Sequence, residues 1–237
     1  MRTMESPACS AFALAHSACA ARIGPAILAA ALFFAAVCAA GQDAKPAAPD
    51  SGWRPMFDGK SLDGWKETPF TAHGPVRVEN GTIVLGSGYM TGVNWTGKLP
   101  TSNYEIRLEA SRIQGSDFFA GITFPVGDSF CTWINGGWGG QLVGLSSLDE
   151  MDASENETSF AREFQNGRWY ALRLRVTDRY IAAWIDDEEV IYVELGNRTI
   201  GLRFGEIELS KPFGIASYGT TAGLRKIEYR LVDAQSR

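Results

Sequence analysis

Along most of the chain, hydrophobic and polar positions follow the pattern of short β-strands separated by turns. Apolar residues at 76–78 and 82–85 flank an Asn-Gly pair, which is the strongest local signal for a β-hairpin. Over 104–109 and 170–176, hydrophobic residues alternate with charged or small ones, which predicts strands with one buried face. Long helical periodicity is absent, and 202–209 offers at most one or two helical turns. The pattern predicts an all-β sandwich or barrel.

The N-terminal region is of a different kind. An apolar run, Ile23–Val37, follows an arginine and precedes small residues from Cys38 onward. This order is typical of a secretory signal peptide, whereas a transmembrane helix needs about 18 or more apolar residues. We therefore expect a signal peptide over 1–40, a linker over 41–52, one folded domain over 53–233, and a secreted or periplasmic location. A retained membrane anchor and a lipid-modified Cys38 are the alternatives, and only the anchor would make the membrane a partner.

Composition narrows the function classes. With 45% hydrophobic and 21% charged residues, the chain is neither disordered, nor a coiled coil, nor a collagen. The net charge is −5 and no basic block occurs, so nucleic acid is not an expected partner. After residue 40 the chain has one cysteine, Cys131, and one histidine, His73. This excludes an intramolecular disulfide framework and a Cys/His zinc site in that part of the chain. We expect Cys131, in an apolar strand, to be a buried, inert thiol.

Several motifs point to a known family. Residues 53–65 read Trp-Arg-Pro-Met-Phe-Asp-Gly-Lys-Ser-Leu-Asp-Gly-Trp, and Gly-Ile-Thr-Phe, Asn-Gly-Arg-Trp-Tyr and Gly-Ile-Ala follow at 121–124, 166–170 and 214–216. In these motifs the chain resembles the 3-keto-disaccharide hydrolase domain family over 53–233. The resemblance implies a concanavalin A-like jelly roll of two antiparallel sheets. It also implies cleavage of glycosides whose sugar carries a ketone at C3.

One glycine-rich stretch carries a candidate ligand-binding residue. In 135–140, four glycines surround Trp138, whose indole could lie flat against the C–H face of a sugar. The alternative is a β-bulge with Trp138 folded back onto the sandwich. Gln141, on the strand expected to follow, is a further candidate for ligand binding. Trp133 and Trp95 are weaker candidates, since tryptophans on strands mostly belong to the core.

An acidic cluster occupies residues 149–157. Glu150, Asp152 and Glu155 match the Glu-x-Asp-x-x-Glu string of laminarinase-like glucanases, which share the jelly roll. On a strand, Glu150 and Asp152 would lie on one face about 6.6 Å apart and Glu155 on the other. A bulge could bring two carboxylates to the separation of about 5–5.5 Å found in retaining glycosidases. A calcium ion held by Asp149, Asp152 and Glu155 is a second interpretation, and the only cofactor we consider. A solvated acidic loop is the third.

A 3-keto-glycoside needs different machinery. The C3 ketone acidifies the C2 proton, so the site requires a base, a group that stabilises the enolate and an acid for the leaving group. His73, the only imidazole after residue 40, is the candidate base, with Asp117 and Asp128 as alternatives.

Three hypotheses follow for the function. The chain is an exported enzyme that hydrolyses or eliminates glycosidic bonds of 3-keto-glycosides, a non-catalytic carbohydrate-binding jelly roll, or a surface interaction domain that uses a sheet face against protein. Carbohydrate is the expected ligand in the first two.

Overall fold

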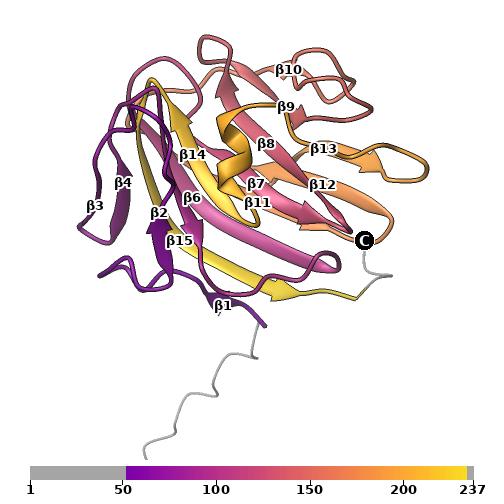
Figure 1. Ribbon diagram of the computed structural model, residues 1–237, viewed down its shortest axis with the longest axis horizontal. Helices are drawn as coiled ribbons and strands as arrows, with labels where there is room; N and C mark the ends of the chain where they lie inside the picture. The colour runs from indigo at the N-terminus through magenta and orange to yellow at the C-terminus, as the bar shows by residue number, and fades with distance from the viewer. Residues whose placement is uncertain (1–51, 234–237) are drawn as a thin grey trace, which may run out of the picture. The chain divides into compact units, whose positions relative to one another are not determined.

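The structure is a computed structural model that describes residues 52–233, which form two antiparallel β-sheets packed face to face (Figure 1). The expected signal peptide and all of the expected linker except Gly52 lie outside the described residues. Within residues 52–233, no helix is long and apolar enough to cross a membrane. The expected all-β, two-sheet antiparallel sandwich is confirmed.

Each sheet interleaves strands from distant parts of the chain. The order in the first sheet is β13 (Glu188–Glu194), β12 (Tyr180–Ile185), β11 (Trp169–Val176), β6 (Tyr104–Gln114), β15 (Thr221–Leu231), β4 (Thr82–Leu85) and β3 (Val76–Glu79), with β1 (Arg54–Pro55) paired to β15. The order in the second sheet is β10 (Phe160–Ala161), β9 (Leu142–Ser146), β8 (Ser129–Gly137), β7 (Gly121–Val126), β14 (Gly214–Tyr218), β5 (Met90–Trp95) and β2 (Trp65–Glu67). The last two strands, β14 and β15, therefore each lie in the middle of a sheet, as in a jelly roll.

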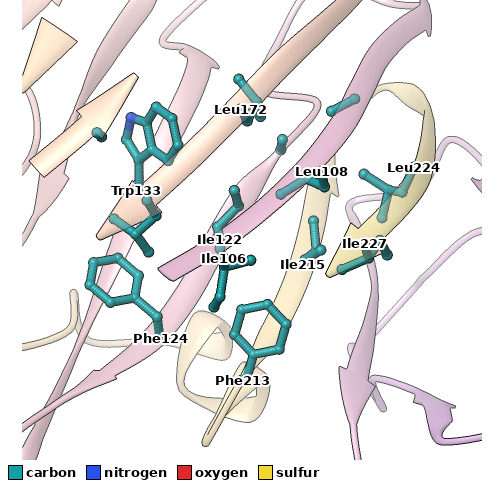
Figure 2. Packing of buried hydrophobic residues seen from close by; sticks show 14 of the residues in the cluster. Ile106, Leu108, Ile122, Phe124, Trp133, Leu172, Phe213, Ile215, Leu224 and Ile227 are labelled. Atoms are coloured by element: carbon teal, nitrogen blue, oxygen red, sulfur yellow. The ribbon is translucent and has the colours of Figure 1, made fainter. Parts of the chain in front are cut away.

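The inner faces of the two sheets form one core. Side chains such as Ile106 and Leu172 from the first sheet point toward Ile122, Phe124 and Ile215 from the second (Figure 2). The alternation seen in the sequence over 104–109 and 170–176 places every second side chain of β6 and β11 in this core. Full burial of one such side chain stabilises the fold by about 1.5–3 kcal/mol.

The family motif at 53–65 has a structural role. The Trp65 indole Nε1 donates a hydrogen bond to the Met56 carbonyl at 2.7 Å, and the Trp65 and Trp95 rings lie 5.4 Å apart. A Cβ atom at Gly64 would lie 2.5 Å from the Trp95 ring, so only glycine allows this packing. The expected hairpin is also present, with Asn80 and Gly81 at positive φ between β3 and β4.

The outer faces of the two sheets differ. A 3-10 helix, η1 (Glu206–Ser210), packs over β14 and β5 of the second sheet, as Figure 1 shows. It falls within 202–209 and one residue beyond, where one or two helical turns were expected. The outer face of the first sheet carries charged side chains, including Glu105 and Arg173.

Candidate functional site

A groove of about 640 Å³ lies on the outer face of the second sheet, beside η1. Its floor includes Thr132 of β8 and Ser146 of β9, which are directly opposite each other in the strand register. Because side chains alternate along a strand, their neighbours Trp133 and Leu145 point into the core instead. The groove therefore has a hydroxyl-bearing floor above an apolar core.

Aromatic side chains form much of the groove's wall. Tyr89, Phe118 and Tyr218 pack on one another, with ring centroids 5.1 Å apart for Tyr89–Tyr218 and 5.9 Å for Phe118–Tyr218. Trp138 and Phe204 also line the groove and are 45% and 94% exposed, respectively. Exposed aromatic rings at a groove with a polar floor are suited to stacking on sugar rings.

Arg203 is the basic side chain of the groove. Its guanidinium lies over the Trp138 ring, 5.6 Å from the centroid, and its Nη1 pairs with Asp152 Oδ2 at 2.9 Å. Asp152 in turn accepts a hydrogen bond from the Ser146 hydroxyl at 2.6 Å. Ser146, Asp152, Arg203 and Trp138 are thus linked by successive contacts. Arg203 keeps 61% of its side chain exposed.

Two carboxylates line the groove, those of Glu206 and Asp117. Glu206 accepts the Thr71 backbone N–H at 3.1 Å, which ties η1 to the preceding loop. Asp117 Oδ1 accepts the Phe118 N–H at 2.8 Å, and its Oδ2 accepts the Gly139 N–H at 3.2 Å. Within residues 52–233, Asp117 makes no ion pair with a basic side chain. Among residues 52–233, Asp117 and Glu206 are therefore two groove carboxylates without an ion pair, and each holds a backbone N–H of a neighbouring loop.

Trp138 occupies a tight turn between β8 and β9 that is fixed from two sides. Asp117 holds Gly139, and Arg112 donates a hydrogen bond from Nη1 to the Gly140 carbonyl at 3.1 Å. A Cβ at Gly140 would lie 2.7 Å from that Nη1 and 2.8 Å from the Ser116 carbonyl oxygen, which explains the glycine there. Burial lowers the pKa of Arg112, which remains a charged donor. These two hydrogen bonds thus hold the turn that carries the Trp138 indole.

A family model described as the 3-keto-alpha-glucoside-1,2-lyase-like domain matches residues 52–230.

The chain belongs to this family.

This match confirms the family that the sequence motifs indicated. No curated protein matches the sequence significantly. A candidate glycosyl hydrolase from Parabacteroides distasonis aligns with a TM-score of 0.50 at 14% identity, over 77% of this chain and 94% of its own. The Crh5 transglycosylase in complex with NAG aligns with a TM-score of 0.52 at 11% identity, over 77% of this chain and 84% of its own. At these identities the likenesses show the fold alone.

Of the four candidates for ligand binding, Trp138, Gln141, Trp133 and Trp95, only Trp138 lines the groove. A bulge does occur between Asn135 and Gly137, but the indole lines the groove rather than folding away from it. Trp133 is fully buried in the core, so its expected ligand contact is corrected. Trp95 packs against that core beside Trp65 and does not line the groove. β8 is buried on both faces, which is why its sequence did not reveal the direction of Trp133.

Gln141 and His73 do not line the groove. Gln141 is exposed at the end of the Trp138 turn, where its backbone carbonyl accepts the Arg162 N–H. His73 is exposed on a loop, with Nδ1 3.0 Å from the Gly74 carbonyl oxygen. Of the candidate bases, Asp117 lines the groove and His73 does not.

The acidic cluster is a loop. Asp149 and Glu150 have positive φ in the turn between Leu148 and Met151, so the strand geometry assumed for Glu150 and Asp152 is wrong. Asp149 pairs with Arg198 at 3.0 Å. Over residues 52–233, no group of three or more His, Cys, Asp and Glu side chains is placed to hold a metal ion. The calcium site at Asp149, Asp152 and Glu155 stays a prediction, which metal removal tests.

Cys131 is fully buried, as expected, and burial raises its pKa to about 12. It is therefore protonated at neutral pH and is not a nucleophile.

Sequence reasoning missed Arg203, Phe204, Glu206 and Tyr218. They come from a loop, a short 3-10 helix and a strand end, with no motif around them. One signal in the sequence was available, namely the pair Arg203-Phe204. The stretch around it shows no strand alternation, so Phe204 was not expected to belong to a buried strand face.

Proposed function

We propose that this domain binds a 3-keto-glycoside in the groove and breaks its C1–O bond by elimination across C1 and C2. Membership of the lyase-like family supports the reaction class. The observation that carries the proposal is the presence of a carboxylate and an exposed guanidinium, those of Asp117 and Arg203, in one aromatic-walled groove.

Asp117 is the proposed base. The C3 ketone makes the C2 proton acidic, and the Asp117 carboxylate takes that proton. The electron pair of the C2–H bond forms an enolate whose negative charge lies on the C3 oxygen. Backbone N–H groups of Phe118 and Gly139 hold the carboxylate in a defined orientation at the groove wall.

Arg203 is the proposed enolate stabiliser. Its guanidinium places positive charge where the C3 oxygen becomes negative, and its pairing with Asp152 limits its movement. The enolate then re-forms the ketone, a C1–C2 double bond appears and the C1–O bond breaks. The departing oxygen takes the proton from Asp117, which restores the carboxylate. Addition of water across the double bond completes net hydrolysis.

Trp138 and Phe204 are the proposed sugar platform. Their exposed rings could stack on the C–H faces of the substrate, while Thr132 and Ser146 offer hydroxyl groups to the ring substituents. Removal of the Trp138 ring should therefore raise KM more than it lowers kcat.

The test incubates the purified protein with 3-keto-trehalose and with unoxidised trehalose, each with calcium and with a chelator, and follows sugar release by chromatography. We expect release from the keto sugar only. Asp117→Asn should slow it by at least about 100-fold, the usual contribution of a general base. Asp128→Asn, in the β7–β8 turn outside the groove, is the matched control and should keep the rate. An Asp117→Asn protein with an undiminished rate contradicts the assignment of the base.

A non-catalytic carbohydrate-binding role is the second candidate. It is favoured by one observation, namely that both groove carboxylates, Asp117 and Glu206, already accept hydrogen bonds from the protein. In that case neither trehalose form is cleaved, whereas titration still shows sugar binding that Trp138→Ala abolishes. Cleavage of the keto sugar would exclude this candidate.

A further inference from the structure

A second hollow lies on the outer face of the other sheet, away from the groove. It measures about 520 Å³ and includes Trp53, Trp184, Arg107, Arg173 and Arg230 in its lining. The groove chemistry uses none of these residues.

Strand register concentrates positive charge at this hollow. Arg107 of β6 lies directly opposite Arg173 of β11, and like charges in opposed positions destabilise a sheet. In the next row Glu105 accepts from Arg173, Arg175 and Arg230, at 3.1, 2.7 and 2.6 Å. One carboxylate therefore serves three guanidinium groups.

Neighbouring acids do not cancel the excess. Glu228 pairs with Arg107 at 2.6 Å, so the three guanidinium groups that line the hollow, those of Arg107, Arg173 and Arg230, pair with two carboxylates. Glu109 is matched by Arg225 and Lys226, and Asp187 adds one negative charge at the edge. The local charge stays positive although the whole chain carries a net charge of −5.

The guanidinium groups are held in place but have donors to spare. Arg107 lies 4.2 Å and Arg230 4.6 Å from the centroid of Trp53, and Arg173 lies 3.7 Å from that of Trp184. Such stacking fixes the planes of the guanidinium groups. Arg107 uses only Nε for Glu228, and Arg173 only Nη1 for Glu105, so within residues 52–233 their other N–H groups have no protein acceptor.

We propose that this hollow is a second carbohydrate-binding site, which takes an acidic polysaccharide by the carboxylate of a uronic acid residue. A carboxylate between Arg107 and Arg173 relieves their repulsion and accepts paired hydrogen bonds from their free N–H groups. The indoles of Trp53 and Trp184 line the same hollow and supply apolar contact for the sugar ring, which favours a sugar over an acidic peptide. The site does not depend on the reaction proposed for the groove.

The test measures binding of the purified protein to polygalacturonate by calorimetry, with dextran and poly-glutamate as the neutral and the acidic-peptide comparisons. We expect binding to polygalacturonate alone, weakening as NaCl rises from about 50 to 200 mM. Arg107→Gln should weaken it at least about tenfold, as for the loss of a charge-assisted hydrogen-bonded pair. Arg77→Gln removes an equally exposed arginine of β3 outside the hollow and should leave binding unchanged.

A second variant separates binding from folding. Arg107→Lys keeps the charge but not the paired donors and should also weaken binding, while Trp138→Ala, in the groove, should not. Absence of binding to polygalacturonate, equal binding to poly-glutamate, or equal weakening by Arg77→Gln would overturn the proposal.

Discussion

Among residues 52–233, Glu105 is the one carboxylate whose side chain is fully buried, and its replacement tests how the charged sheet face is held together. In Glu105→Gln, three arginines lose their shared counter-charge. Removing one partner of a buried ion pair costs about 3–5 kcal/mol. Because Arg173, Arg175 and Arg230 keep 29%, 11% and 31% exposure, water compensates part of the loss. We expect a loss of about 2–3 kcal/mol in the free energy of unfolding, and a Tm lower by about 4–12 °C.

The loss should depend on pH. Burial by itself would raise the pKa of Glu105, but hydrogen bonds from Arg175 and Arg230 and their charges outweigh it and lower the pKa below its ordinary 4.5. A carboxyl with a lowered pKa in the folded state stabilises the fold fully above its unfolded pKa. That contribution disappears as the pH falls through the folded-state pKa. The difference between wild type and Glu105→Gln should therefore be full at pH 7 and shrink in acid.

Urea unfolding followed by tryptophan fluorescence at pH 7 and at several values below 4.5 measures both effects. Glu228→Gln is the control, since Glu228 is 27% exposed and pairs with one arginine, and it should cost less than about 1 kcal/mol. The reasoning is refuted if the two variants are equally stable at pH 7, or if the Glu105→Gln difference is the same at every pH.

Three further predictions concern single side chains. Cys131, with its pKa raised to about 12 by burial, should escape iodoacetamide at pH 8 until urea unfolds the protein; peptide mapping that finds it alkylated in the folded state would contradict its burial. Gly92→Ala should lower stability by about 1–3 kcal/mol, because its Cβ would lie 2.9 Å from both the Ile215 carbonyl oxygen and the Phe70 ring; an unchanged urea midpoint would show that this layer yields. Phe204→Ala, at a side chain 94% exposed, should change stability by less than about 0.5 kcal/mol yet raise KM for the keto sugar, and an unchanged KM would remove it from the platform.

Local patterns in the sequence were sufficient for much of the fold. Alternation over 104–109 and 170–176 placed two central strands, and Asn80-Gly81 placed a hairpin, because strand period and turn chemistry depend on near neighbours. The glycines around Trp138 likewise marked the one tryptophan candidate that reaches the groove. These features follow from backbone conformation within a few residues.

Only the tertiary structure assembled the groove and decided which side chains face it. Asp117, Arg203 and Tyr218 meet there because β14 inserts between β7 and β5, a pairing that no local pattern encodes. Trp133 and Ile134 are adjacent apolar residues on a strand that is buried on both faces, so hydrophobic alternation could not show which face each one occupies. In the structure, Trp133 belongs to the core and Ile134 lines the groove. The acidic cluster had the spacing of a catalytic string, but Asp149 and Glu150 lie in a turn with positive φ instead of on the strand that the string requires. Sequence thus indicated that these segments form strands and a hairpin, whereas contact between segments about 100 residues apart determined the site.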